Sequence, residues 1–221
     1  TIVNGFLADK VDLIMANATP ALQAAAAATN TVPILGTSVT DYASALEIDN
    51  WSGTVGGNIS GTSDLAPLDQ QAAMLQELFP NAKKVGLLFC SSEANSKYQV
   101  DEVTKLLTAA GITCTEFAFT DSNDVSSVTQ KACDASDVLF IPTDNTAASC
   151  TEAISAVALP AGVPIVAGEE GICKGCGIAT LSIDYYELGR TTGAMAAKIL
   201  TGESNVSEMP IEYYQNPVKK Y

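Results

Sequence analysis

The chain has 221 residues, 47% of them hydrophobic, so it is long enough for one large domain or two small ones with a sizeable core. Its formal net charge of −14 argues against nucleic-acid binding, because phosphate contacts need clustered Lys and Arg. It contains no histidine, and therefore neither the usual general base nor a Ser-His-Asp or Cys-His arrangement, so we expect no catalytic residues and no enzyme. No apolar run approaches the roughly 20 residues that a membrane-spanning helix needs.

The first elements are predicted to alternate between helix and strand. Residues 1–10 are expected to be the end of a helix, because their apolar side chains fall on one face. A helix with no strand before it is unusual in a parallel α/β protein, so we expect a strand–helix–strand unit upstream. Strands are predicted at 11–15 and 32–35, joined by an alanine-rich helix that Thr19 caps and Pro20 begins.

Residues 49–64 are rich in Gly, Ser, Asn and Thr, and they predict a loop that marks the first domain boundary. Trp51, the only tryptophan, lies in this loop and serves either as a packing aromatic or as a wall of a ligand pocket. Beyond it, alternating elements predict a parallel sheet with right-handed crossovers. The predicted helices are 67–79, 95–110, 123–135 and 146–158, and the predicted strands are 84–90, 113–119, 137–142 and 163–167. A strand at 178–183, an amphipathic helix at 185–200 and an extended piece at 209–214 follow.

The stretch 137–148 shows how the strands are expected to end. Its unbroken apolar run, Val138 to Ile141, predicts a strand buried on both faces, and polar residues that suit a helix start follow at once. Ligands bind at the carboxyl ends of strands in open parallel sheets. The same pattern recurs at 11–22, 33–46, 84–98 and 163–172. The five polar strand ends therefore predict one shared ligand-binding cleft.

The six cysteines predict little chemistry. Four of them, placed in or beside predicted strands and helices, are expected to be small buried hydrophobes. Cys173 and Cys176 form a CxxC pair in a predicted glycine-rich loop, CKGCG, with no further thiolates close by to complete a zinc site. The pair is open to three interpretations, in falling order: plain thiols or a local disulfide, a redox-sensitive pair, or a metal-binding pair. We expect no metal and no cofactor.

Four segments together resemble a known family. They are NISGTSDLAPLDQQ (58–71), PNAKKVGLLFCSSEANS (80–96), VLFIPTDNTA (138–147) and SIDYYELGRTTGAMAAKILTGE (182–203). With them the chain resembles, over essentially its whole length, the ABC-transporter substrate-binding proteins of the tryptophan and aromatic amino-acid type, which have the type I periplasmic-binding-protein-like fold.

This resemblance implies two α/β lobes, each a doubly wound parallel sheet, joined by a three-strand hinge and closing on a small ligand. The first lobe would take residues 1–60 and 178–205, and the second lobe residues 61–177 and 206–221. The family has an additional β-α-β unit at its start. The first lobe is therefore expected to be truncated at its N-terminal side, with part of the site absent.

An amino-acid ligand presents a carboxylate, an ammonium and a side chain. The carboxylate needs hydroxyl and N–H donors at helix N-termini. The candidates for it, each of which also fits a simple helix cap, are Thr19, Ser92, Asn95 and Ser96.

The ammonium needs a fixed carboxylate with little else to pair with, and Asp144 is the first choice. The alternative role of Asp144 is that of an N-cap or Asx turn. Asn145 beside it can both donate and accept, which suits an oriented zwitterion. The carboxylates ranked behind Asp144 are Asp41, Glu169 and Glu170.

The opposing lip of the cleft is predicted from hydroxyl and carboxylate side chains of the first lobe and its boundary: Thr37, Ser38, Ser63 and Asp64. An aromatic ligand side chain would need aromatic neighbours, and the candidates are Tyr42, Trp51 and Tyr98. Tyr185 and Tyr186 precede the long helix and are expected to pack at the hinge.

None of these groups forms a nucleophile–base pair, and the resemblance implies transport. The expected protein is the extracytoplasmic solute-binding component of an ABC importer, which closes on an amino acid-like ligand and delivers it to a membrane permease. It is expected to be a monomer in the periplasm or, with a lipid anchor, at the outer cell surface. The alternative is a ligand-sensing domain of a receptor or transcriptional regulator on the same fold. An enzyme on a doubly wound sheet ranks third, because no GxGxxG or Walker phosphate loop is present.

Overall fold

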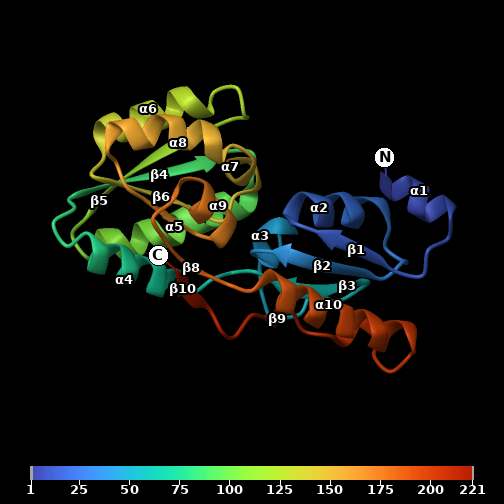
Figure 1. Ribbon diagram of the computed structural model, residues 1–221. Coiled ribbons are helices and arrows are strands. Elements are labelled where there is room, and N and C mark those ends of the chain that lie inside the picture. The colour runs from blue at the N-terminus through green and yellow to red at the C-terminus, as the bar shows by residue number, and fades with distance from the viewer. Residues whose placement is uncertain (1, 221) are drawn as a thin grey trace. The chain divides into compact units, whose positions relative to one another are not determined.

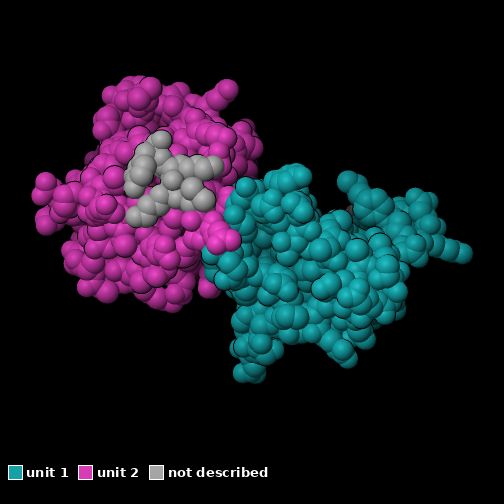
Figure 2. Space-filling model, turned by 60° about the horizontal axis from the view of Figure 1, so that its bottom comes forward, with its two compact units in different colours: residues 1–65, 184–215 teal, residues 66–183, 216–221 magenta. Residues whose placement is uncertain are grey.

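The chain folds into two compact units, which Figure 2 shows in different colours. In the computed structural model, which describes residues 2–220, unit 1 comprises residues 1–65 and 184–215, and unit 2 comprises residues 66–183 and 216–221. Each unit is built around one mainly parallel sheet with helices on both faces (Figure 1). The predicted α/β class with two doubly wound lobes is confirmed.

Unit 1 holds a four-stranded sheet in the order β1-β2-β3-β9, with every pairing parallel. Its strands are β1 (Ile14–Asn17), β2 (Ile34–Val39), β3 (Ile59–Ser63) and β9 (Glu212–Tyr213). Helix α2 (Thr19–Ala28) lies on one face and α10 (Tyr185–Leu200) on the other (Figure 1). The remaining elements are α1 (Ile2–Ala8), α3 (Tyr42–Ala45) and the short 3-10 helix η1 (Val206–Glu208).

Unit 2 holds a six-stranded sheet in the order β10-β8-β7-β6-β4-β5, in which only β10 runs antiparallel. Its strands are β4 (Lys84–Cys90), β5 (Thr113–Phe119), β6 (Val138–Ile141), β7 (Ile165–Ala167), β8 (Ala179–Ser182) and β10 (Val218–Lys220). Helices α4 (Leu68–Leu78) and α5 (Ala94–Ala109) cover one face, and α6 (Val125–Ala135) and α8 (Thr151–Ala161) cover the other (Figure 1). The short helices α7 (Asn145–Ser149) and α9 (Glu170–Cys176) follow β6 and β7.

Two elements show how the sequence produces these layers. The apolar run Val138–Ile141 forms β6, and all of its residues are buried because β4 and β7 flank it and helices cover both faces. Helix α10 buries an apolar stripe that includes Leu188 and Met195. Asp184 caps this helix by accepting hydrogen bonds from the backbone N–H groups of Tyr186 and Glu187. Within the described residues, no helix is both long and apolar enough to cross a membrane.

The unit boundaries differ from the predicted lobes in three places. Residues 61–65, expected in the second lobe, belong to unit 1 together with the rest of β3. Strand β8, expected in the first lobe, pairs with β7 in unit 2. Residues 206–215, expected in the second lobe, belong to unit 1 because β9 pairs with β3. The chain thus passes between the units three times, at 65/66, 183/184 and 215/216. Thr1 and Tyr221, which the lobe prediction also assigned, lie outside the described residues.

Two segments predicted to be loops contain a strand or a helix, so these predictions are wrong. Strand β3 lies inside the segment 49–64, and its small polar residues gave no apolar signal. They are nevertheless buried because their hydroxyls find partners: Ser60 Oγ donates to Met209 O at 3.0 Å and Ser63 Oγ to Thr40 O at 2.9 Å. The CKGCG segment ends helix α9, whose N-cap Glu169 accepts hydrogen bonds from the N–H groups of Gly171 and Ile172.

Candidate ligand-binding site

In unit 2, the carboxyl ends of β4 and β6 are joined by Asp144. Its Oδ2 accepts a hydrogen bond from Cys90 N and its Oδ1 one from Ala147 N, both at 2.7 Å, so it caps helix α7. Ser96 of α5 adds a hydroxyl hydrogen bond to the same carboxylate. The Asp144 side chain is only 1% exposed. Asp144 therefore has the predicted N-cap role, and its role as counter-ion stays a prediction.

Glu93, which the sequence did not single out, is a second carboxylate at this edge. It is 6% exposed and precedes α5. Its Oε2 accepts from Asn145 N at 2.9 Å and Nδ2 at 2.7 Å, and its Oε1 accepts from Thr146 N at 2.8 Å and Oγ1 at 2.7 Å. Glu93 thereby ties the start of α5 to the start of α7. No local pattern reveals this pairing, because its partners lie more than 50 residues along the chain.

Glu93 and Asp144 affect each other's charge. Burial, and then the charge of Glu93, raise the pKa of Asp144 to about 6. Burial acts to raise the pKa of Glu93 too, but the hydrogen bonds from Thr146 and Asn145 outweigh it and lower that pKa. None of the ion pairs formed by the described residues involves either carboxylate. This edge of unit 2 therefore carries buried negative charge without a cation.

The other predicted residues of unit 2 surround this pair. Asn95 Nδ2 donates to Thr143 O at 3.1 Å, and Gln99, not predicted, donates to the same oxygen at 2.9 Å. Asn95 Oδ1 is buried and has no hydrogen-bond partner in the described structure. Ser92 is exposed, with its Oγ 3.1 Å from Cys90 Sγ. The half-buried Glu169 follows β7 at the same edge, because β6 and β7 run parallel.

In unit 1, two strained residues mark the carboxyl ends of β1 and β2. Ala18 has a φ of 75° and Ser38 a φ of 53°, values that residues other than glycine seldom adopt. Helix α2 starts one residue earlier than predicted: Ala18 is its N-cap, no side chain caps it, and Thr19 lies buried in the first turn with Pro20. The predicted cap by Thr19 is therefore wrong, because Ala18 takes that position.

The carboxyl ends of β2 and β3 are joined by hydroxyl and carboxylate groups. The hydroxyl of Thr192 lies 2.8 Å from that of Thr62 and donates to that of Thr37 at 3.0 Å. Asp64 N donates to Val39 O at 3.3 Å, and Asp64 Oδ2 accepts from Tyr185 Oη at 3.1 Å. Thr37 and Ser38, near the end of β2, and Asp64, just after β3, thus lie at the same edge of the unit 1 sheet, because β2 and β3 run parallel.

Asp41 and Tyr42 open helix α3 at the same edge. Asp41 is the N-cap of this helix and accepts from Ser44 N at 2.8 Å. Tyr42 is fully buried, and its Oη donates to Thr62 O at 3.0 Å. The prediction that Tyr42 flanks the ligand side chain is wrong, because its ring fills the core of unit 1.

Comparison with known proteins assigns the chain that carries these two polar edges to a family. The family described as ABC transporter substrate binding protein matches residues 1–218. The chain belongs to this family. A tyrosine-binding protein of Clostridioides difficile is 37% identical over 211 residues, which are 96% of this chain and 61% of that protein. The chain thus spans less than two thirds of the length of this relative.

Solved structures of other proteins agree with the fold. An ABC domain from Streptococcus pneumoniae in complex with L-Trp is 31% identical, with a TM-score of 0.93 over 99% of this chain and 75% of that one. A conserved domain protein from Vibrio cholerae gives the same identity and TM-score over 99% and 73%. A periplasmic solute binding protein of Actinobacillus succinogenes, at 20% identity and a TM-score of 0.65, shares the fold, covering 99% of this chain and 81% of that one. The type I periplasmic-binding-protein-like fold is confirmed.

The cysteines of this ABC substrate binding protein are all free thiols in the structure. Among the described residues, no group of three or more Cys, Asp or Glu side chains could hold a metal ion. Burial, followed by the neighbouring Cys173 and Glu169, raises the pKa of Cys176 to about 12. Cys176 is therefore a protonated, unreactive thiol at neutral pH.

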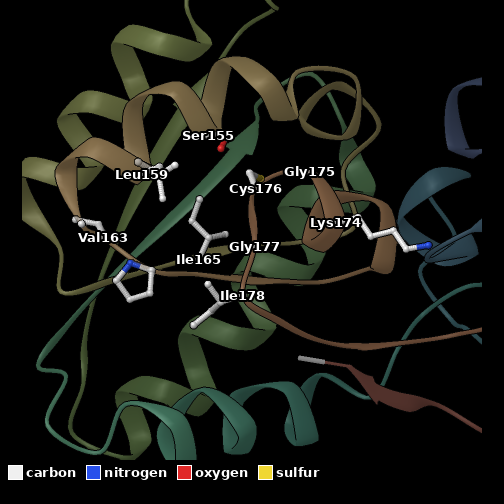
Figure 3. Close-up of a pocket in the computed structure, with 12 residues that line it drawn as sticks. Ser155, Leu159, Val163, Ile165, Lys174, Gly175, Cys176, Gly177 and Ile178 are labelled. Atoms are coloured by element: carbon white, nitrogen blue, oxygen red, sulfur yellow. The ribbon is translucent and has the colours of Figure 1, made fainter.

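Unit 2 also has an apolar groove of about 360 Å³ away from the polar edge (Figure 3). Leu159 of α8, Ile165 of β7 and Ile178 line it, and Lys174 of α9 points away from them in Figure 3. The groove lies at the amino ends of β7 and β8. Because the polar cluster of Glu93 and Asp144 lies at the carboxyl ends, the two features occupy opposite edges of the same sheet.

Proposed function

We propose that this protein is the extracytoplasmic solute-binding component of an ABC importer and binds an amino acid with an aromatic side chain. Two relatives support this ligand class: one is called a tyrosine-binding protein, and another is in complex with L-Trp. Membership of the ABC substrate binding proteins favours transport over the sensing alternative. The expected partner is the permease of the importer, and the expected location is the periplasm or a lipid-anchored position outside the cell.

The observation that carries the proposal is the buried negative charge of Glu93 and Asp144, which takes part in no ion pair among the described residues. Buried carboxylates are costly without a cation, so a ligand ammonium near them would be stabilised. Their oxygens already accept hydrogen bonds from N–H and O–H groups. Asp144 therefore serves as counter-ion through its charge, while Asn145 and the buried Asn95 Oδ1 supply polar contacts to the ligand.

The ligand carboxylate is assigned to the polar edge of unit 1. Helix α2 has ten residues and no side-chain cap, so its first N–H groups suit an anion. Thr19 and Ser38 add hydroxyls there. By contrast, the start of α7 in unit 2 is occupied by the carboxylates of Glu93 and Asp144. We therefore assign the ligand ammonium to the polar edge of unit 2 and the ligand carboxylate to the polar edge of unit 1.

Ligand binding would drive the closure that the family resemblance implies, and the closed form would dock to the permease. The test is a thermal-shift screen of the standard amino acids and simple sugars. A ligand at about 100 times its Kd stabilises a protein by roughly 2.7 kcal/mol. We expect tryptophan, tyrosine or phenylalanine to raise the Tm; no shift with any amino acid would overturn the proposal.

A further inference from the structure

Trp51 and Tyr213 form an aromatic pair at the carboxyl edge of the unit 1 sheet. Strand β9 pairs with β3 in parallel, and this places Tyr213 opposite Ser63, the last residue of β3. The indole N–H of Trp51 donates a hydrogen bond to the Tyr213 hydroxyl, since indole has no acceptor. Asp41, which follows β2, lies near enough to act on the Tyr213 hydroxyl through its charge. Tyr213 thus shares the edge that holds Ser38 and Asp64.

The pair is held in place by the packing of two segments far apart in the sequence. Ile211 N donates to Gly53 O at 2.8 Å, which ties the loop after α3 to the segment that enters β9. Ile211 is buried in the same core cluster against which Trp51 packs. Trp51 is therefore fixed by the core, and its N–H fixes Tyr213 in turn.

Tyr213 is more exposed to solvent than Trp51 and Tyr42. Tyr42 is fully buried and Trp51 is half-buried, whereas Tyr213 is 37% exposed. An aromatic ring that is held at one end and open on part of its surface offers contact area at little cost in entropy. We propose that Tyr213, positioned by Trp51, contacts the side chain of the bound amino acid and makes the site prefer aromatic over aliphatic ligands; this inference rests on the proposed function.

The test is isothermal titration calorimetry with L-tryptophan and L-leucine on the wild type, Tyr213→Ala, Tyr213→Phe and Trp51→Phe. Aromatic pair interactions correspond to about 2- to 10-fold in affinity. For Tyr213→Ala we expect the Kd of tryptophan to rise at least that much and the Kd of leucine to change less than about 3-fold. Tyr213→Phe keeps the ring, so the Kd of tryptophan should change little. Trp51→Phe removes the N–H donor, so it should raise the Kd of tryptophan by an amount between those of Tyr213→Phe and Tyr213→Ala. Tyr186→Ala, which removes a 74% exposed tyrosine of the same unit, is the control and should change neither Kd.

Two outcomes separate this inference from the proposed function. If the wild type binds no amino acid, the proposed function fails and this inference fails with it. Suppose that the wild type binds tryptophan but Tyr213→Ala and Trp51→Phe change the Kd of tryptophan and the Kd of leucine by the same factor. The proposed function then stands, and only the role of Tyr213 is overturned. Trp51→Phe decides the matter should Tyr213→Ala not fold.

Discussion

Glu93 and Thr146 are joined by two hydrogen bonds through one carboxylate oxygen, 2.8 Å to the backbone nitrogen and 2.7 Å to the hydroxyl. The second oxygen of Glu93 makes the equivalent pair of bonds to Asn145. One side chain therefore closes the start of α7 and links it to the start of α5. This clasp links the helices that follow β4 and β6 at the polar edge of unit 2.

The clasp predicts that Glu93 matters for stability. Glu93→Ala leaves the N–H groups of Asn145 and Thr146 without their acceptor, and we expect the free energy of unfolding to fall by about 3 kcal/mol. Glu93→Gln keeps one acceptor oxygen and should lose roughly half of that. Urea denaturation measures both. Glu203→Ala, at an exposed position, is the matched control and should stay within about 0.5 kcal/mol of the wild type; an equal loss in both would contradict the clasp.

Asp144 predicts a pH dependence of stability. Its pKa is raised from an ordinary value of 3.8 to about 6, so the folded state holds this proton more tightly than the unfolded state. Between pH 4 and 6 the unfolded chain has lost the proton while the folded one keeps it. The contribution of Asp144 to the free energy of unfolding therefore falls by about 2 to 3 kcal/mol as the pH rises through this range. Below about pH 4 that contribution is fully present. Asp144→Asn should remove this slope in denaturation curves recorded from pH 4 to 7; a slope unchanged in the variant would argue against the assignment.

Asp144 also predicts a pH dependence of binding. Protonation below about pH 6 removes one of the negative charges that attract the ligand ammonium, so affinity for an amino acid should fall as the pH drops from 7 to 5. Asp144→Asn should bind more weakly at pH 7 and show a flatter profile. Fluorescence or calorimetric titrations across this range measure both effects. An affinity that rises on acidification would contradict the role of Asp144 as counter-ion.

Gly61 predicts a steric limit in unit 1. A Cβ at this position would lie 2.1 Å from Gly36 O and 2.4 Å from Tyr42 Oη, and its φ is +150°. We expect Gly61→Ala to destabilise the protein by about 3 kcal/mol, through overpacking and backbone strain together. Gly189→Ala is the matched control on α10, where nothing lies within 4 Å of the added Cβ. It should stabilise by up to about 1 kcal/mol because alanine favours the helix.

Local patterns were enough for much of the fold. The apolar run Val138–Ile141 and the stripe of α10 each encode an element and the face that it buries. Strand β3 was not predictable in this way, because its buried serine hydroxyls depend on Met209 and Thr40, which come from other segments. Nonlocal partners override local signals in such cases.

The candidate site shows the same division. Positions after strands predicted Asp144, Asn95 and Ser38 at polar edges, because parallel strands all end on one side. The contacts that shape these edges could not be predicted from the sequence, because they join segments far apart in the chain. Glu93 contacts the start of α7 although α5, β5, α6 and β6 lie between them in the chain, and Tyr213 reaches Trp51 only because β9 adds to the sheet of unit 1.

We propose above that the site binds an aromatic amino acid through both of its charged ends. The most direct measurement is a calorimetric titration of the wild-type protein with L-tryptophan, N-acetyl-L-tryptophan and L-tryptophanamide at pH 7. We expect tight binding of L-tryptophan and an affinity lower by at least about 100-fold for each blocked analogue, because a buried charge would then lack its partner. Equal affinity for all three, or no binding of L-tryptophan, L-tyrosine and L-phenylalanine, would contradict it.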